Sequence, residues 1–192
     1  MKKSALFSIV PLVVSVISTV SVKAQTYEVG TNVISAGLGL GGSIADGYTY
    51  GSQTPGFSLQ YEHGFWEAGP GVISLGAYLG FKGYKYAYDN GAGLKISEKW
   101  NYAIVGVRGA WHFTGLNVDN LDLYAGLMLS YDDLRFSYSD NQGGHYAGTK
   151  YNSDVQLTAF AGAKYYFAGN WGAFAELGYG VSFLNVGLSY KF

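Results

Sequence analysis

The sequence has no cysteine, only three prolines and few charged side chains. Its 192 residues include 13% Asp, Glu, Lys and Arg, against about 25% in an average soluble domain. The missing cysteine excludes disulfide scaffolds, thiolate metal sites, iron–sulfur clusters, cysteine nucleophiles and lipid attachment at an N-terminal cysteine. The formal net charge of −1 gives no basic footprint for nucleic acid. We therefore expect neither a typical soluble helical enzyme nor a nucleic-acid partner.

Glycine and aromatic residues are abundant instead. The chain contains 29 Gly and 18 Tyr, and 17% of its residues are aromatic. This aromatic content argues against a disordered chain, which would lack the means to form a core. The length suits one domain.

Residues 1–24 have the three parts of a cleavable signal peptide. Lys2 and Lys3 precede an apolar run over 5–22, and Val22 and Ala24 place small residues at the −3 and −1 positions of a cleavage site. We expect export and cleavage after Ala24.

The alternative for this segment is a retained transmembrane helix, because the apolar run approaches the length of a span. Pro11 and five Ser or Thr residues inside the run favour the signal peptide. The predicted mature domain is 25–192. It is more acidic than the full sequence, because the signal peptide contains three Lys and no acidic residue.

From residue 32 onward, apolar residues alternate with Gly, Tyr and polar residues at period two, which indicates β-strands. In 71–82, for example, Ile73, Leu75, Ala77, Leu79 and Phe81 share one face, and Ser74, Gly76, Tyr78, Gly80 and Lys82 share the other. The pattern predicts eight strands, at 32–42, 56–66, 71–86, 97–113, 120–137, 152–167, 171–180 and 183–192.

The connections between these strands alternate in length. The long ones are 43–55, 87–96 and 138–151; the short ones are 67–70, 114–119 and 168–170; the connection near 180–182 is tight. Even strand number, strands of about ten residues and alternating loops are typical of outer-membrane barrels. The sequence predicts an all-β fold, an eight-stranded antiparallel transmembrane up-and-down β-barrel.

A soluble barrel such as a lipocalin is the structural alternative, and it would hide its apolar face around a ligand. Here the second face is too polar to form an oily core, so the apolar face should contact lipid. Aromatic residues also gather in two belts, as at lipid headgroup levels. The belt near the short turns contains Phe65, Trp66, Trp111, Phe113, Phe167, Trp171 and Phe192, and the other contains Tyr84, Tyr86, Tyr88, Trp100, Tyr102, Tyr131 and Tyr179.

Alternation places His112 and seven charged residues on the inward face: Glu62, Lys82, Arg108, Asp122, Lys164, Glu176 and Lys191. Four of the charged residues are predicted to form a network. Glu62, Arg108, Lys164 and Glu176 lie three to five residues from the short-turn ends of their strands, which places them at one level. Ionised groups in a narrow interior need partners, since an unpaired buried charge costs several kcal/mol. A barrel of eight strands is just wide enough for side chains to fill, so we interpret this network as structural and expect a plugged lumen. A narrow gated pore stays open as an alternative.

Catalytic and metal sites have little support. His63, His112 and His145 show no metal-ligand spacing, so we expect no metal and no cofactor. A lipid A-modifying enzyme, similar to small barrels that use a His and a Ser, is the enzymatic alternative. In this chain such an enzyme would use Ser137, Ser139 and His145. No acidic residue is placed to orient the histidine. We expect a protein that is not an enzyme.

The last strand alternates apolar residues up to a terminal aromatic residue: Leu184, Val186, Leu188, Tyr190 and Phe192. With the segments 71–76 and 175–180, it resembles the small outer-membrane β-barrel family that includes OmpX and the OmpA transmembrane domain. This resemblance implies that the barrel-assembly machinery reads those five residues during insertion. It also implies that the predicted network is similar to the charged core that closes the OmpA lumen.

The predicted function is that of an integral outer-membrane barrel with a structural or surface-interaction role, such as adhesion or binding. The three long extracellular loops are rich in Gly, Tyr, Asp, Asn and Ser, which suits exposed contacts. We expect a monomer in contact with outer-membrane lipid and lipopolysaccharide. The sequence does not identify an extracellular ligand.

Overall fold

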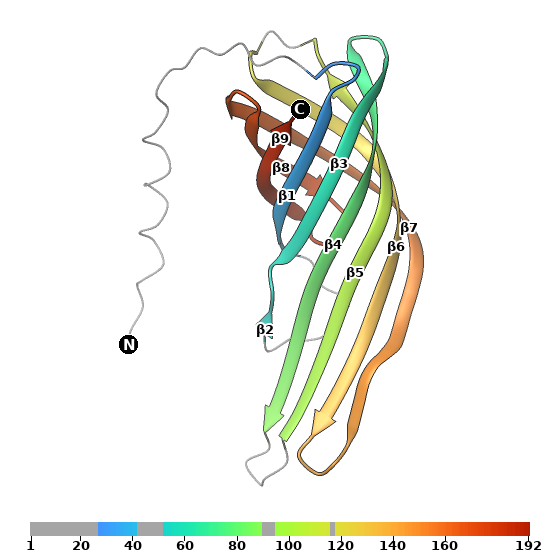
Figure 1. The fold of residues 1–192 in the computed structure, drawn as a ribbon. Helices are drawn as coiled ribbons and strands as arrows, with labels where there is room; N and C mark the ends of the chain where they lie inside the picture. The colour runs from blue at the N-terminus through green and yellow to red at the C-terminus, as the bar shows by residue number, and fades with distance from the viewer. Residues whose placement is uncertain (1–26, 42–51, 90–94, 116–117) are drawn as a thin grey trace, which may run out of the picture.

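The computed structural model describes residues 27–41, 52–89, 95–115 and 118–192. The predicted signal peptide, its cleavage point and most of the loop 43–55 lie outside the described residues. The strands (Figure 1) are β1 (Asn32–Leu40), β2 (Ser52–Gln53), β3 (Gly56–Glu67), β4 (Gly71–Asp89), β5 (Lys95–Phe113), β6 (Leu121–Asp140), β7 (His145–Ala168), β8 (Trp171–Gly178) and β9 (Leu184–Lys191).

Eight of these strands form a closed antiparallel barrel. Each pairs with its neighbours in sequence, and β1 pairs with β9 to close the cylinder. The short strand β2 precedes β3 in the chain and pairs with β4 at Tyr84 and Lys85, just beyond the residues that pair with β3. This confirms the predicted up-and-down topology. Within the described ranges, no helix is long and apolar enough to span a membrane.

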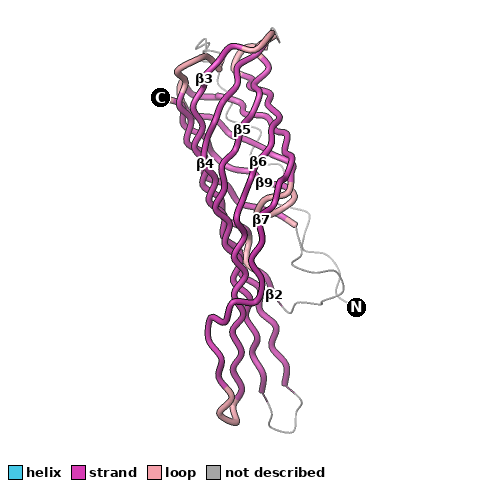
Figure 2. Tube along the Cα trace, turned by 90° about the vertical axis from the view of Figure 1, so that its right-hand side faces the viewer, coloured by secondary structure: helices cyan, strands magenta, loops and turns pink. Residues whose placement is uncertain are grey.

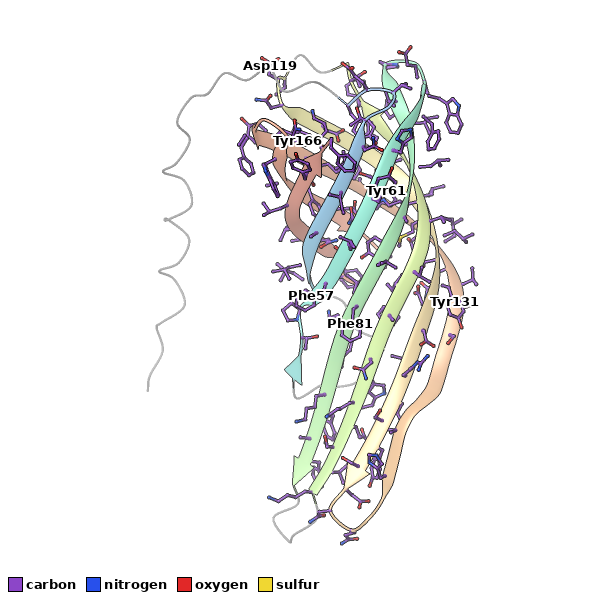
Figure 3. The ribbon with its side chains drawn as sticks, viewed as in Figure 1. Phe57, Tyr61, Phe81, Asp119, Tyr131 and Tyr166 are labelled. Carbon is purple, nitrogen blue, oxygen red and sulfur yellow. The ribbon has the colours of Figure 1, made fainter. Side chains whose placement is uncertain are left out.

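The alternation of the sequence sets the two faces of the wall. In β1, buried Val33, Ser35 and Gly37 alternate with outward residues. The outer face exposes large apolar side chains, including Leu127 at 55% and Leu157 at 70%. Figure 3 labels Phe57, Phe81 and Tyr131 on this wall, and each is about half exposed. The apolar face therefore points outward, the reverse of a soluble lipocalin-like barrel.

Strands β4 to β7 continue well beyond the other four (Figures 1 and 2). This extension begins at a row of four register partners on neighbouring strands: Lys82, Tyr102, Leu134 and Asn152. We call residues 82–89, 95–102, 134–140 and 145–152 the protruding sheet.

The protruding sheet corrects two predicted loops. Pairing of β4 with β5 runs up to Asp89 and Lys95, and pairing of β6 with β7 runs up to Ser139 and His145. Residues 87–89, 95–96, 138–140 and 145–151 of the two expected loops are therefore strand. The prediction ended each strand where its apolar face ended, but strand pairing needs only backbone hydrogen bonds and continues with polar side chains until turn residues intervene.

Candidate functional site

Four charged side chains meet inside the barrel. The Arg108 guanidinium donates two hydrogen bonds to Glu176, with Nη2 2.6 Å from Oε2 and Nη1 3.3 Å from Oε1. Its Nε lies 3.4 Å from Glu62 Oε1, and the Lys164 ammonium donates to Glu62 Oε2 at 2.5 Å. All four residues are buried. The structure thus brings together the four residues that the sequence analysis placed at one level, from β3, β5, β7 and β8.

Glycines between these residues give their side chains room. Gly76 lies in register between Glu62 and Arg108. Gly162 lies in register between Tyr124 and Glu176, and the Tyr124 hydroxyl donates to Glu176 Oε2 at 3.0 Å across it. A Cβ at Gly162 would come within 2.6 Å of the Tyr124 hydroxyl oxygen. The inward glycines therefore allow long side chains to reach across a narrow lumen.

Aromatic rings complete the environment of the two cations. The Arg108 guanidinium lies 3.8 Å from the Phe160 ring centroid, and the Lys164 ammonium lies 3.8 Å from that of Tyr124. A buried charge is tolerated only when it is paired and hydrogen-bonded. Here two carboxylates face two cations whose other sides contact aromatic faces, so the network carries no net charge. We name Glu62, Arg108, Lys164 and Glu176 the lumen network.

A second hydrogen-bonded chain lies nearer the short-turn end of the barrel. His112 Nδ1 is 2.8 Å from Asp122 Oδ1, and His112 Nε2 is 3.0 Å from the Ser74 hydroxyl. Asp122 Oδ2 lies 3.9 Å from Lys164, which connects this chain to the lumen network. The Tyr27 ring stacks on His112 with centroids 3.6 Å apart.

Sequence reasoning missed this second chain. It placed His112 and Asp122 on the inward face without joining them, although each lies two residues from an end of the same short connection. That shared position is a signal that could have paired them. Tyr27 precedes the first strand, so no alternation marks it as buried, and it is 2% exposed.

Apolar side chains close the lumen on the other side of the network. Tyr78, Ile104, Met128, Phe160 and Val181 form a buried cluster. Val181 belongs to the tight β8–β9 connection, and its backbone N–H donates to the Tyr78 hydroxyl at 3.2 Å. The cavity beside Arg108 and Glu176 measures only about 10 Å³. That space is too small for a substrate.

The final strand joins β8 to β1 across the barrel seam. Its alternating apolar residues face outward: Leu188 is 52% and Phe192 is 61% exposed, and Leu184, Val186 and Tyr190 are partly exposed. These five side chains form one stripe on the outer wall. Recognition of the stripe by the assembly machinery stays a prediction.

The three residues considered for lipid A chemistry lie on the protruding sheet. Ser139 and His145 face each other in register next to its β6–β7 tip, and Ser137 pairs with Lys99 of β5. The described contacts of His145 include no hydrogen bond to Ser139. His63 contacts Asn32 through Nδ1 at 2.8 Å. Among the described residues, no group of three or more His, Asp or Glu side chains could hold a metal ion.

The outer face of the protruding sheet carries a basic patch, formed by Lys85, Lys99 and Arg135. Lys85 and Lys99 are directly opposite each other in register and both are exposed. Arg135 follows on the next strand, two residues from the partner of Lys99, and its side chain is 62% exposed. Asp133 pairs with Arg135 at 2.7 Å, which leaves the two lysines as the main source of positive charge.

Comparisons with known proteins give structural likeness without sequence matches. No protein-family model and no curated protein matches the chain. Similar solved structures include Ail, the attachment invasion locus protein of Yersinia pestis, in complex with the heparin analogue sucrose octasulfate. That structure shares 18% identity with this chain, covers 86% of it and 100% of its own chain, and has a TM-score of 0.50.

Two further Ail structures from the same organism have lower scores. One is a crystal structure, with 19% identity, 86% and 100% coverage and a TM-score of 0.45. The other is of the outer membrane protein Ail in a phospholipid bilayer nanodisc, with 17% identity, 85% and 99% coverage and a TM-score of 0.43. The likeness to the complex, together with the strand pairing, shows that this chain has the fold of a closed eight-stranded antiparallel β-barrel, as Ail does.

Proposed function

We propose that this chain is an integral outer-membrane barrel that binds a partner outside the cell through its protruding sheet. The apolar outer wall supports the membrane location, because such a surface is stable only in contact with lipid. Exposed Trp66, Trp111 and Trp171 at the short-turn end suit a lipid headgroup level. The export signal predicted over 1–24 and the outward stripe of the last strand support delivery and insertion. The barrel closes on itself and acts as a monomer.

The observation that carries a binding role is the basic patch. Like charges directly opposite each other on neighbouring strands destabilise a sheet, and Lys85 and Lys99 have this arrangement on an exposed face. A bound anion would offset their repulsion. The patch lies outside the apolar band, where headgroup phosphates or soluble polyanions can reach it.

The ligand class that fits this patch is a polyanion bearing sulfate or phosphate groups. Ail was solved with a heparin analogue, and lipopolysaccharide phosphates of the same membrane share the chemistry of a repeated anion. Both sources would contact the two lysines through charge-assisted hydrogen bonds. A sulfated glycan implies adhesion, whereas lipopolysaccharide implies a structural role in the membrane surface.

A lysine substitution with a charge-matched control tests this role. Lys99→Gln removes the central charge of the patch, and Lys95→Gln removes an equal charge from the same strand near the sheet tip. Binding of refolded barrel to immobilised heparin and to purified lipopolysaccharide should weaken about tenfold for Lys99→Gln and little for Lys95→Gln. Added salt should weaken it further by screening. Equal effects of both variants, or no binding of either polyanion, would contradict the proposal.

We propose a binding role in preference to two alternatives, a lipid A-modifying enzyme and a narrow pore. A histidine that activates a serine normally lies within hydrogen-bond reach of it, and no described hydrogen bond joins His145 to Ser139. Unchanged lipid A masses in cells that overproduce the barrel are the expected result; a new lipid A species would contradict it.

The plugged lumen argues against a pore. Planar bilayers containing the barrel should show no discrete conductance steps at several voltages.

A further inference from the structure

A second cavity lies on the inner face of the wall, beyond the apolar cluster that closes the lumen. It has a volume of about 230 Å³. Its walls come from β4 to β7 and from the β8–β9 connection, and they include Tyr84, Tyr102, Asp132, Asp154, Tyr179 and Phe183. We call it the upper cavity. The basic patch lies on the opposite face of the sheet, so the two features are independent.

Two aspartates face each other in this cavity. Asp132 of β6 and Asp154 of β7 are register partners, an arrangement that repulsion between like charges disfavours. Asp132 is only 6% exposed. Its carboxylate accepts hydrogen bonds from the hydroxyls of Tyr102 at 2.5 Å and Ser130 at 2.8 Å. These neutral donors fix its position but do not neutralise its charge.

The described part of the chain supplies no cation to either aspartate. None of its ion pairs includes Asp132 or Asp154. Lys82 is near in register, but its ammonium donates to the Gly41 carbonyl oxygen at 2.5 Å and lies 5.2 Å from the Tyr84 ring centroid. A buried carboxylate without a counter-charge is costly, and a bound cation would remove that cost.

The walls of the cavity favour an organic cation over a metal ion. Calcium takes six to eight oxygen ligands, among them carboxylates. This cavity offers two carboxylates together with Ser and Gln side chains, and no group of three or more acidic or His side chains among the described residues could hold a metal ion. Aromatic faces attract ammonium groups, and Tyr102 and Tyr179 line the same cavity as Asp132. The volume suits a short alkyl chain. We infer that the upper cavity binds a primary alkylammonium group, as found on a diamine or on a lysine side chain.

Calorimetric titration of the refolded full-length barrel with putrescine tests this inference, with 1,4-butanediol as the neutral probe of similar shape. Saturable binding of putrescine alone is expected. Asp132→Asn should weaken it at least tenfold, and the exposed Asp154→Asn should weaken it without a risk to folding. Asp133→Asn is the matched control, because it removes the same charge from the adjacent, outward position of β6. It should leave the affinity unchanged.

A second arm separates the two sources of the ammonium group. A short peptide with one lysine is compared with the same peptide acetylated at that lysine. Tight binding of the unmodified peptide identifies a protein partner, and binding of putrescine alone identifies a free amine; both support the inference. Absence of saturable amine binding to the unmodified barrel would overturn it. So would equal losses in Asp132→Asn and Asp133→Asn, or calcium binding that displaces putrescine and depends on Asp132.

Discussion

The ring of Tyr27 stacks on the imidazole of His112, with centroids 3.6 Å apart and planes inclined by 5°. Tyr27 also packs with Val33 and Val72. These contacts place the residue before the first strand across the short-turn mouth of the barrel. Tyr27 therefore covers the Ser74–His112–Asp122 group and adds to the packing of the lumen.

Tyr27→Ala should destabilise the barrel by about 3 kcal/mol, because it removes a buried aromatic ring and leaves a cavity over His112. Val29→Ala is the matched control, since Val29 lies two residues further on and is 50% exposed; it should change stability by less than about 0.5 kcal/mol. Urea unfolding in lipid vesicles, followed by tryptophan fluorescence, measures both. Equal midpoints for the two variants would show that the stacking contributes nothing.

Arg108→Met should cost about 3–5 kcal/mol, because it leaves Glu62 and Glu176 with a buried excess of negative charge. The double variant Arg108→Met, Glu176→Gln removes one of the two carboxylates and should recover part of this loss. Heat-modifiable gel migration shows whether each variant still inserts and folds, and urea unfolding gives the free energies. A double variant less stable than the single one would contradict the charge argument.

Gly76→Ala tests the close approach of β3 and β4 beside the lumen network. The added Cβ would collide with the Tyr61 carbonyl oxygen of the neighbouring strand, and overpacking of this kind costs about 1–3 kcal/mol. A Cβ at Gly83, on the same strand, would make only ordinary van der Waals contacts, with the nearest atom 3.4 Å away. Gly83→Ala should therefore fold as the unmodified chain does. Equal folding yields and unfolding midpoints for both variants would refute the steric account.

The sequence was sufficient to predict which side chains face the lumen, because a period of two assigns every strand residue to one face. All seven charged residues placed inward by this rule are buried: Glu62, Lys82, Arg108, Asp122, Lys164, Glu176 and Lys191. The strand order also followed, since each short turn forces an antiparallel neighbour. The height of each charged residue along the barrel was predicted by counting the residues between it and the nearest short turn.

Strand ends and contacts across the barrel were harder to predict. Tyr84 was expected in the aromatic belt near the long loops, but its inward position on β4 places it in the wall of the upper cavity. The pairing of Asp132 with Asp154 depends on the β6–β7 register. Register shifts near Leu134 and Phe136 occur in that hairpin, and single-sequence alternation does not reveal them.

The tip of the protruding sheet contains a carboxylate that titrates outside the membrane-spanning strands. The Asp140 Oδ1 atom accepts backbone N–H bonds from Gln142 and Gly144, both at 2.8 Å. These bonds lower the pKa of Asp140 below its ordinary value, because they favour the charged form. Since the folded pKa is the lower one, this stabilisation is fully present above the unfolded pKa of about 3.9. It is lost as the pH falls through the folded pKa.

The amide signals of Gln142 and Gly144 should therefore stay constant between about pH 5 and 8 and shift only below the ordinary Asp range. NMR of the barrel in detergent micelles measures this midpoint directly. Asp140→Asn should abolish the titration and speed hydrogen exchange at both amides, because an amide oxygen is a weaker acceptor than a carboxylate. Asp133→Asn, which alters the ion pair with Arg135 on the same strand, should leave both amides unchanged. A midpoint at or above the ordinary Asp pKa would contradict the role of these two hydrogen bonds.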